Sequence, residues 1–217
     1  MSLVMQVRWL GGVRQLATAE PGSDPHLAAV HNYNAGVTAG KIITSTRRPE
    51  TIYRIAGLLA RPLGRDRLLI VGPRNVQELL VAWIHGFAWR NVEAIDLYST
   101  HPRIRTMDMH RLEYPDGSFG VVTMVNTLGY ASDIPAVVAG VARILSPGGR
   151  FCFSHAHVPQ SDTFAGDLVP IKTVLNACRQ AGLRTYFHQI EDKTNSRGLR
   201  QLSHYVGVEK ATEATIS

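Results

Sequence analysis

The sequence predicts an α/β protein with a doubly wound sheet of seven strands, mostly parallel with an antiparallel last strand, and with helices on both faces. From about residue 63 onward, apolar strand-like segments alternate with segments of helical periodicity, the pattern of a parallel sheet with helical crossovers. The early strand segments are apolar throughout, as strands buried on both faces must be. Only about nine residues separate the last two strand segments, too few for a helical crossover, so we expect them to pair antiparallel at a sheet edge.

The N-terminal part of the chain predicts a mainly helical cap over residues 1–62, followed by an α/β domain over residues 63–217. The segment 49–62 favours a helix with Pro49 in its first turn, where a missing N–H costs little. The apolar side chains of this segment recur at helical spacing, at Ile52, Ile55, Leu58 and Leu59. The first residues of the chain lack the long apolar run of a secretion signal, so we expect an ordinary N-terminus.

The elements of the α/β domain follow one another at short intervals. The expected strands are residues 67–72, 92–99, 104–109, 119–126, 150–156, 184–191 and 201–209. The expected helices are residues 76–87, 133–145 and 167–182, and the Pro and Gly residues at 146–149 favour a turn before the fifth strand.

Composition excludes several classes of protein. The balance of 23 basic against 17 acidic residues gives a net charge of +6, but the basic residues are spread along the chain, which does not favour nucleic-acid binding. No apolar run approaches the roughly 20 residues of a membrane span. Cys152 and Cys178 lie far apart in apolar segments, and we interpret both as core thiols of a reduced, cytoplasmic protein.

Polar residues gather where the expected strands end. In a doubly wound sheet, ligands bind outside the carboxyl ends of the strands, and the turn after the first strand is the usual nucleotide contact. That turn runs from Gly72 to Asn75 here, and Asp96 ends the next strand, 24 residues after Gly72. An acid at this position can accept hydrogen bonds from both ribose hydroxyls of an adenosine. Asp108 follows the third strand, beside the same pocket.

Three longer segments carry a family resemblance: 92-VEAIDL-97, 106-TMDMHRLEYPDGSFGVV-122 and 143-RILSPGGRF-151. They resemble the class I S-adenosylmethionine-dependent methyltransferases, over roughly residues 65 to 158. Within that superfamily the chain is similar to small-molecule enzymes, in a subgroup whose first turn has the pattern G-x-R-x-x-x-E. The resemblance implies a Rossmann-like fold, S-adenosylmethionine as cofactor, and methyl transfer to a small-molecule acceptor by in-line displacement.

The chain also departs from the usual pattern of this family. Ile70 stands where the first strand usually has an acid, Gly72 is the one glycine left of a G-x-G-x-G turn, and Gly120 replaces an Asp. S-adenosylmethionine has no pyrophosphate, however, so a side chain can take over from bare backbone in this turn. Arg74 offers a two-pronged donor for the methionine carboxylate, and Glu78, one helical turn later, an acceptor for the methionine ammonium.

The expected cofactor-binding residues are Gly72, Arg74, Glu78, Asp96, Leu97, Asp108, Met109, His110 and Asn126. Each has a structural alternative. Asp96 and Asp108 can be turn acceptors, since Asp is common at strand ends. Arg74 can form a surface salt bridge, Glu78 can stabilise the first turn of its helix, and His110 can cap the next helix.

The candidates for catalysis are Tyr130, His155 and His157, although a general base is optional because the methyl donor is already activated. Tyr130 follows the fourth strand, where the family places residues that face the acceptor, but it can also be a packed aromatic. His155 and His157 point to the same face of a strand, but no carboxylate or Cys joins them at ligand spacing, so we expect no metal.

The N-terminal cap is expected to cover the pocket with Arg47, Arg48, Tyr53 and Arg54. These arginines favour a small-molecule partner that is anionic. A homodimer is compatible with the sequence, and neither a membrane nor a nucleic-acid partner is expected.

Two other functions are compatible with parts of the sequence. The missing strand acid, the missing glycines and Gly120 would suit a methyltransferase-like protein that has lost catalysis and acts as a binding or partner protein. An NAD-dependent oxidoreductase would need G-x-G-x-x-G after the first strand, and that motif is absent.

Overall fold

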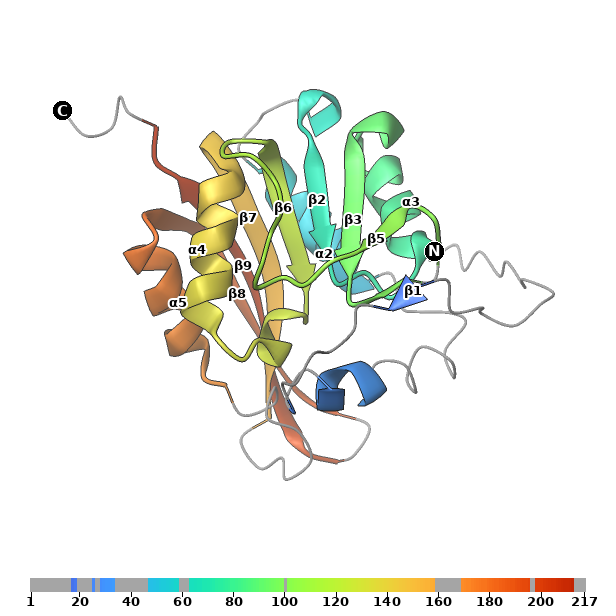
Figure 1. The fold of residues 1–217 in the computed structure, drawn as a ribbon. Coiled ribbons are helices and arrows are strands. Elements are labelled where there is room, and N and C mark those ends of the chain that lie inside the picture. The colour runs from blue at the N-terminus through green and yellow to red at the C-terminus, as the bar shows by residue number, and fades with distance from the viewer. Residues whose placement is uncertain are drawn as a thin grey trace.

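The computed structural model describes residues 17–18, 25, 28–33, 47–58, 63–99, 101–158, 169–195 and 198–212. Their main feature is one seven-stranded sheet with the strand order β5-β3-β2-β6-β7-β9-β8 (Figure 1). In that order the strands are Ile104–Thr106, Val92–Asp96, Leu68–Val71, Phe119–Val125, Leu145–His157, Arg200–Lys210 and Leu183–Thr194. The predicted fold class is therefore confirmed.

The direction of each strand also matches the prediction. The pairs β2–β3, β2–β6, β3–β5 and β6–β7 are parallel. The last strand, β9, is antiparallel to both β7 and β8, and β8 forms the edge of the sheet. One pairing was not predicted: β1 (Ala17–Thr18) lies antiparallel to β4 (Tyr98–Ser99), apart from the main sheet.

Helices cover both faces of the sheet. The bounds are Arg47–Gly57 for α2, Val76–Ile84 for α3, Ile134–Ile144 for α4 and Ile171–Gln180 for α5. In Figure 1, α4 and α5 lie together on the face turned toward the viewer, and α2 lies behind the sheet. Helix α2 contacts β6, β7, β9 and α3. Short 3-10 helices at Leu63–Arg65, Trp89–Asn91 and Leu128–Tyr130 complete the connections.

Two buried clusters of apolar side chains follow from this layering. The larger lies under α4 and α5, and the other lies under α2 and α3. The four residues of β2 are all buried, as predicted for a strand covered on both faces. Cys178 belongs to the first cluster and Cys152 to the second, and both are free thiols, which confirms them as core residues. Burial raises the pKa of Cys152 to about 11, so this thiol stays protonated.

Two predicted helices end three or more residues earlier than expected. Helix α2 ends at Gly57, and Leu58, which was placed on its apolar face, is exposed; the remaining predicted residues 59–62 lie outside the described residues. Helix α3 ends at Ile84, where Gly86 takes a φ of 100°. The N–H of Gly86 then bonds to the Trp83 carbonyl and that of Phe87 to the Ala82 carbonyl, the pattern of a Schellman cap.

Side chains from the sheet bind the C-terminal end of α2. Arg150 is fully buried in β7, where it donates to the carbonyl of Ala56 and forms an ion pair with Asp66. The Tyr186 hydroxyl donates to the Ile55 carbonyl at 3.1 Å. A Cβ at Gly207 would lie 2.7 Å from the Ile55 side chain, so only glycine lets the helix approach β9 this closely.

The same buried ion pair gives a structural reason for glycine at position 120. A Cβ built at Gly120 would lie only 2.5 Å from a carboxylate oxygen of Asp66. The glycine thus makes room for the carboxylate that neutralises Arg150. An uncompensated buried charge is costly, so glycine at this position serves the fold.

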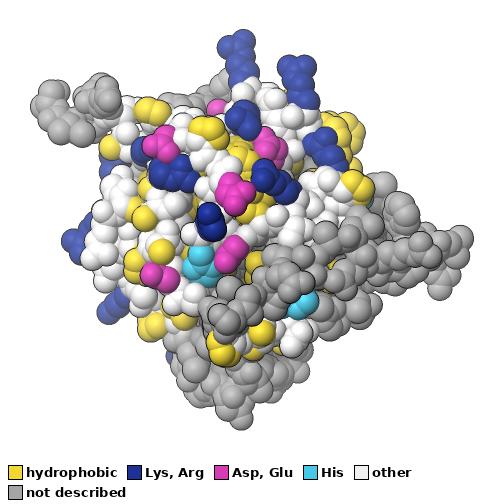
Figure 2. Space-filling view, viewed as in Figure 1, with side chains coloured by type: hydrophobic (Ala, Val, Ile, Leu, Met, Phe, Trp, Pro, Cys, Tyr) yellow, Lys and Arg dark blue, Asp and Glu magenta, His cyan; other side chains and the backbone are white. Residues whose placement is uncertain are grey.

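Neither the described helices nor the face seen in Figure 2 suggests a membrane or nucleic-acid partner. No helix in the described part of the chain is long and apolar enough to cross a membrane. Figure 2 shows Lys and Arg side chains interspersed with Asp and Glu on the face that carries α4 and α5.

Candidate functional site

A cavity of about 670 Å³ opens at the carboxyl ends of β2, β3 and β6, beside the N-terminus of α2. Eight of the predicted site residues line it: Gly72, Arg74, Glu78, Asp96, Leu97, Met109, Asn126 and Tyr130. Four others are not among the described residues that line it: Asp108, His110, His155 and His157. The cavity also has lining residues that were not predicted, including Thr127, Lys193 and Tyr205.

The turn after β2 needs its single glycine. Gly72 has a φ of 74°, in the left-handed region, and its N–H donates to the Ile95 carbonyl at 2.8 Å. A Cβ at this position would lie 2.5 Å from the side chain of Thr127, whose hydroxyl donates to the Val71 carbonyl at 3.2 Å. Thr127 follows β6 without any motif, so the sequence did not mark its role in closing this turn.

Glu78 lies in the first turn of α3, which is capped by the Asn75 side chain accepting from the Gln77 N–H at 3.0 Å. Its Oε1 atom accepts the backbone N–H of Arg74 at 3.1 Å. Its Oε2 atom is buried and has no hydrogen-bond partner among the described residues. Burial raises the pKa of Glu78 to about 7. A buried acceptor without a partner, on the wall of a cavity, fits a ligand that brings a donor.

Asp96 ends β3 and lines the same cavity between Ile95 and Leu97. Its Oδ1 atom accepts the N–H of Tyr98 at 3.2 Å, which fixes the carboxylate at the strand end. Removal from solvent raises the pKa of Asp96 to about 7. The cavity therefore holds two carboxyl groups whose ionised forms lack the solvation that a bound cation or hydroxyl would supply.

Asp108 and His110 form a linked pair that lies next to the cavity. Asp108 Oδ1 accepts both the backbone N–H of His110 at 2.9 Å and its ring Nδ1–H at 2.7 Å. His110 Nε2 accepts the N–H of Ser132 at 3.1 Å, which requires the proton on Nδ1. The hydrogen bond from His110 holds the pKa of Asp108 below its usual value. The pair joins this loop to the segment after β6, and Met109 between them faces the cavity.

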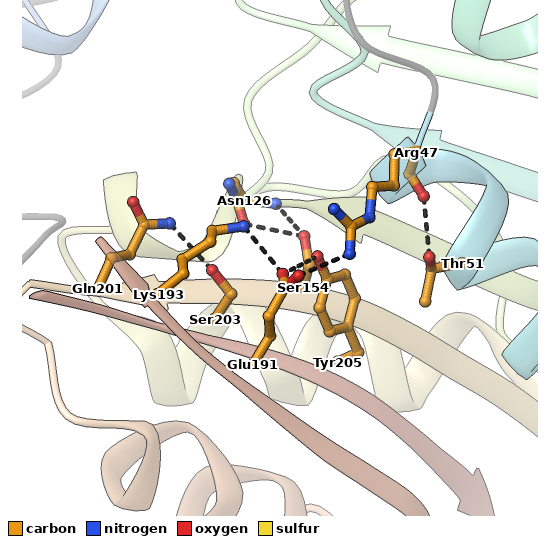
Figure 3. Close-up of polar contacts among 9 residues, drawn as sticks. All are labelled: Arg47, Thr51, Asn126, Ser154, Glu191, Lys193, Gln201, Ser203 and Tyr205. Carbon is orange, nitrogen blue, oxygen red and sulfur yellow. Dashed lines mark hydrogen bonds and ion pairs between the residues drawn. The ribbon is translucent and has the colours of Figure 1, made fainter. Parts of the chain in front are cut away.

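Asn126 is the one described non-glycine residue with a positive φ, at 55°. The Ser154 hydroxyl donates to Asn126 Oδ1 at 2.9 Å, and the Asn126 N–H donates to the Ser154 carbonyl at 3.0 Å (Figure 3). Asn tolerates this conformation better than most residues, and such backbone is frequent at functional sites. Strands β6 and β7 thus hold Asn126 rigidly at the cavity wall.

The two histidines of β7 face away from the cavity. Side chains alternate along the strand, and Phe151 and Phe153, on the same face as His155, belong to the cluster under α4 and α5. The ring of His155 is buried and donates from Nε2 to the Val169 carbonyl at 2.8 Å. His157 follows on that face, and its Nδ1 atom is buried without a partner in the described structure. Of the three candidate catalytic residues, Tyr130 alone lines the cavity.

The far end of the cavity is cationic. Arg47 and Arg48 from the start of α2 and Lys193 from β8 line it, with Tyr205 of β9 between them. Glu191 accepts from Arg47 at 2.7 Å and from Lys193 at 2.8 Å, as Figure 3 shows. These residues of β8 and β9 belong to no motif.

Two other residues of the predicted cap lie elsewhere. Tyr53 is buried in the cluster under α2 and α3, where its hydroxyl donates to the Glu78 carbonyl at 3.3 Å, so its expected position over the pocket was wrong. Arg54 is exposed and is not among the residues that line the cavity. Among the described side chains, no group of three His, Cys, Asp or Glu is arranged to hold a metal ion.

Comparisons with known proteins agree with this fold. A family model described as a methyltransferase domain matches residues 85–153. No curated protein matches the sequence. The solved structures that resemble the chain share little sequence with it, so the likeness concerns the fold.

Three of these structures show which kinds of protein share the fold. The N-methyltransferase NodS from Bradyrhizobium japonicum, in complex with S-adenosyl-L-homocysteine, has a TM-score of 0.64 at 12% identity, covering 86% of this chain and 99% of that chain. Geranyl diphosphate methyltransferase in complex with SAM has a TM-score of 0.61 at 15% identity, covering 91% and 97%. The [4+2]-cyclase SpnF has a TM-score of 0.54 at 15% identity, covering 74% and 81%. The chain has the Rossmann-like methyltransferase fold.

Proposed function

We propose that this protein is a S-adenosylmethionine-dependent methyltransferase that acts on a small-molecule acceptor, in the subgroup whose first turn has the pattern G-x-R-x-x-x-E. The observation that carries the proposal is a pair of carboxyl groups, buried Glu78 and half-buried Asp96, on the wall of one cavity at the carboxyl ends of β2 and β3. The match of residues 85–153 to a methyltransferase domain supports it.

The residues around the cavity suit the parts of S-adenosylmethionine. Asp96 is the acceptor for the ribose hydroxyls, with Leu97 and Met109 beside the adenine. Glu78 Oε2, which has no partner among the described residues, is the acceptor for the methionine ammonium. Arg74 donates to the methionine carboxylate. Asp108 lies next to the cavity, outside its lining, and its two hydrogen bonds with His110 use Oδ1, so Oδ2 is the acceptor we propose for the adenine amino group.

Charge supports the same ligand. Arg74, Glu78 and Asp96 together carry one more negative than positive formal charge. S-adenosylmethionine carries a sulfonium and an ammonium against one carboxylate, so its net charge is positive. Binding would therefore remove the penalty that burial imposes on the two ionised carboxyl groups.

The bound cosubstrate would supply an electrophilic methyl group that needs no further activation. The residues of this chain then contribute mainly by holding the acceptor in line and excluding water, which is worth up to about 7–11 kcal/mol in favourable cases. Asn126 and Tyr130 line the cavity after β6, which lies between β2 and the strands of the cationic end in the sheet order, and the acceptor would lie beside them. Tyr130 is the candidate to contact the acceptor from the cavity wall through its hydroxyl.

The second candidate is a binding or partner protein without methyl transfer. Ile70 and the reduced glycine turn favour it, and the likeness to a [4+2]-cyclase shows that a related fold can serve another reaction. Gly120 no longer counts toward it, because this glycine accommodates Asp66. A cytoplasmic location and the division into residues 1–62 and 63–217 stay proposals.

Calorimetric titration with S-adenosylhomocysteine tests the proposal. We expect binding, and we expect Asp96→Ala to weaken it by about 10-fold or more, since a hydrogen bond to a charged group contributes about 1.5–3 kcal/mol. The control is Asp116→Ala, which removes an exposed acid outside the lining of the cavity. If neither S-adenosylhomocysteine nor S-adenosylmethionine binds, the proposal fails, and transfer of a labelled methyl group separates an enzyme from a binding protein.

A further inference from the structure

The cationic end of the cavity, formed by Arg47, Arg48 and Lys193, has no part in holding the cosubstrate as described above. Lys193 belongs to β8 and Arg74 follows β2, and the sheet order separates these strands by four steps. At about 4.8 Å per step, the two positions are roughly 19 Å apart along the sheet edge. The carboxylate of one bound cosubstrate reaches one of these positions and not both.

Positive charge is in excess at this end. Three cations line it, and Glu191 is the one described carboxylate that forms ion pairs with them, so the group has a formal net charge of +2. The Tyr205 hydroxyl donates to Glu191 at 3.3 Å and adds a further polar group at the same wall. Repulsion between these three cations destabilises the folded protein unless an anion binds among them. Such an arrangement is typical of a functional site.

The helix that supplies the arginines increases this excess. Arg47 and Arg48 occupy the first turn of α2 with Glu50, which is not among the cavity-lining residues, and the helix dipole adds partial positive charge there. Cations are normally favoured at the opposite end of a helix. The arrangement stabilises a bound anion and disfavours an empty site.

We propose that the cationic end binds an anionic group of the acceptor, a carboxylate or a phosphate. The inference rests on the proposed function, and it names the substrate class of that site. Arg48 and Lys193 are the binding residues, and Glu191 is a positioning residue that holds the Lys193 ammonium and the Arg47 guanidinium toward the cavity. Asn126 and Tyr130 line the cavity after β6, and β6 lies between β2 and the strands β9 and β8 in the sheet order. The anionic group thus anchors one end of the acceptor while its other end meets the methyl donor.

The test uses the full chain saturated with S-adenosylhomocysteine, so that the cosubstrate site is filled. Calorimetry measures binding of inorganic phosphate, of malonate and of neutral malonamide. We expect one or both anions to bind and malonamide not to bind, and the tighter anion identifies the acceptor group. Lys193→Gln should weaken anion binding about 10-fold or more, and Arg48→Gln should do the same.

The matched control is Arg54→Gln, which removes an exposed arginine from the same helix outside the cavity lining and should leave anion affinity unchanged. Thermal melts followed by circular dichroism check that each variant folds. The inference is overturned if neither anion binds, if malonamide binds equally well, or if anion affinity survives both Lys193→Gln and Arg48→Gln.

Titration with S-adenosylhomocysteine alone keeps the two proposals apart. Its failure to bind the unaltered protein counts against the proposed function, while the anion titrations still judge the cationic end. If Lys193→Gln abolishes S-adenosylhomocysteine binding, the cations serve the cosubstrate and the inference is wrong.

Discussion

Lowering the pH from 7 to 6 is expected to weaken binding of S-adenosylhomocysteine by up to about 25-fold. The pKa values of Glu78 and Asp96 are both raised to about 7 by burial in the ligand-free protein. In the proposed binding mode, the ligand ammonium and the ribose hydroxyls bind the ionised carboxylates. Affinity therefore rises with pH as the two groups lose their protons, and it falls as the pH drops through their pKa values.

The magnitude follows from the ionised fraction of each carboxyl group. A group with a pKa near 7 is about half ionised at pH 7 and about one-tenth ionised at pH 6, so each contributes about five-fold. Both together give about 25-fold, an upper value because Asp96 raises the pKa of Glu78, so the two groups do not titrate independently. The ligand's own ammonium stays protonated throughout, since α-amino groups titrate near 7.7–8.0.

Calorimetry in two buffers of different ionisation enthalpy measures both affinity and proton release. In the Glu78→Gln variant, the loss of affinity between pH 7 and pH 6 should fall to about five-fold, because only Asp96 still titrates. 5′-Methylthioadenosine lacks the amino-acid moiety, so its affinity for the unaltered protein should also fall only about five-fold between pH 7 and pH 6. Affinity that is equal at pH 6 and 7, or that rises as the pH falls, refutes the assignment of these two carboxylates to the ligand.

Three further predictions follow from single contacts. Gly72→Ala should lower the melting temperature and S-adenosylhomocysteine affinity more than Gly182→Ala, because both have positive φ but only the first meets a side chain, and equal losses would contradict this. Arg74→Ala should weaken S-adenosylhomocysteine about 10-fold and leave 5′-methylthioadenosine unchanged in calorimetry, and equal affinity for the first ligand refutes its role. Asp66→Ala should cost about 3–5 kcal/mol in urea denaturation because Arg150 loses its counter-ion, and a cost below about 1 kcal/mol would disprove it.

Periodicity predicted the sheet because buried strands and amphipathic helices repeat one pattern over many residues. The seven strands, their directions and the edge position of β8 follow from that pattern and from the short link between β8 and β9. The pairing of β1 with β4 did not, because a strand of two residues has no period. The end of α2 at Gly57 was missed for a related reason, since the apolar spacing continues past the residue where the helix ends.

The site was predictable where its residues follow strands in known order. The turn after β2 begins with Gly72, β3 ends with Asp96, and β6 is followed by Asn126. The carboxyl ends of these three strands share one edge of the sheet, where the cavity lies. Lys193 was not predictable, because it comes from an edge strand far along the chain with no motif. The sequence could not show that His155 faces away from the cavity. Alternation along β7 shows which residues share a face, but it does not show which face meets the cavity.

The attachment of α2 bears on how such a protein can change its specificity over time. The C-terminal end of this helix is held by Arg150 and Tyr186 from inside the core, while its N-terminal end carries Arg47 and Arg48 to the cavity. Under the proposed function, substitution at those two positions alters the chemistry presented to an acceptor without disturbing the packing that holds the helix. Mutational drift at the start of α2 can therefore explore new acceptors while the fold is conserved, and a library randomised at these positions is a natural starting point for engineering selectivity.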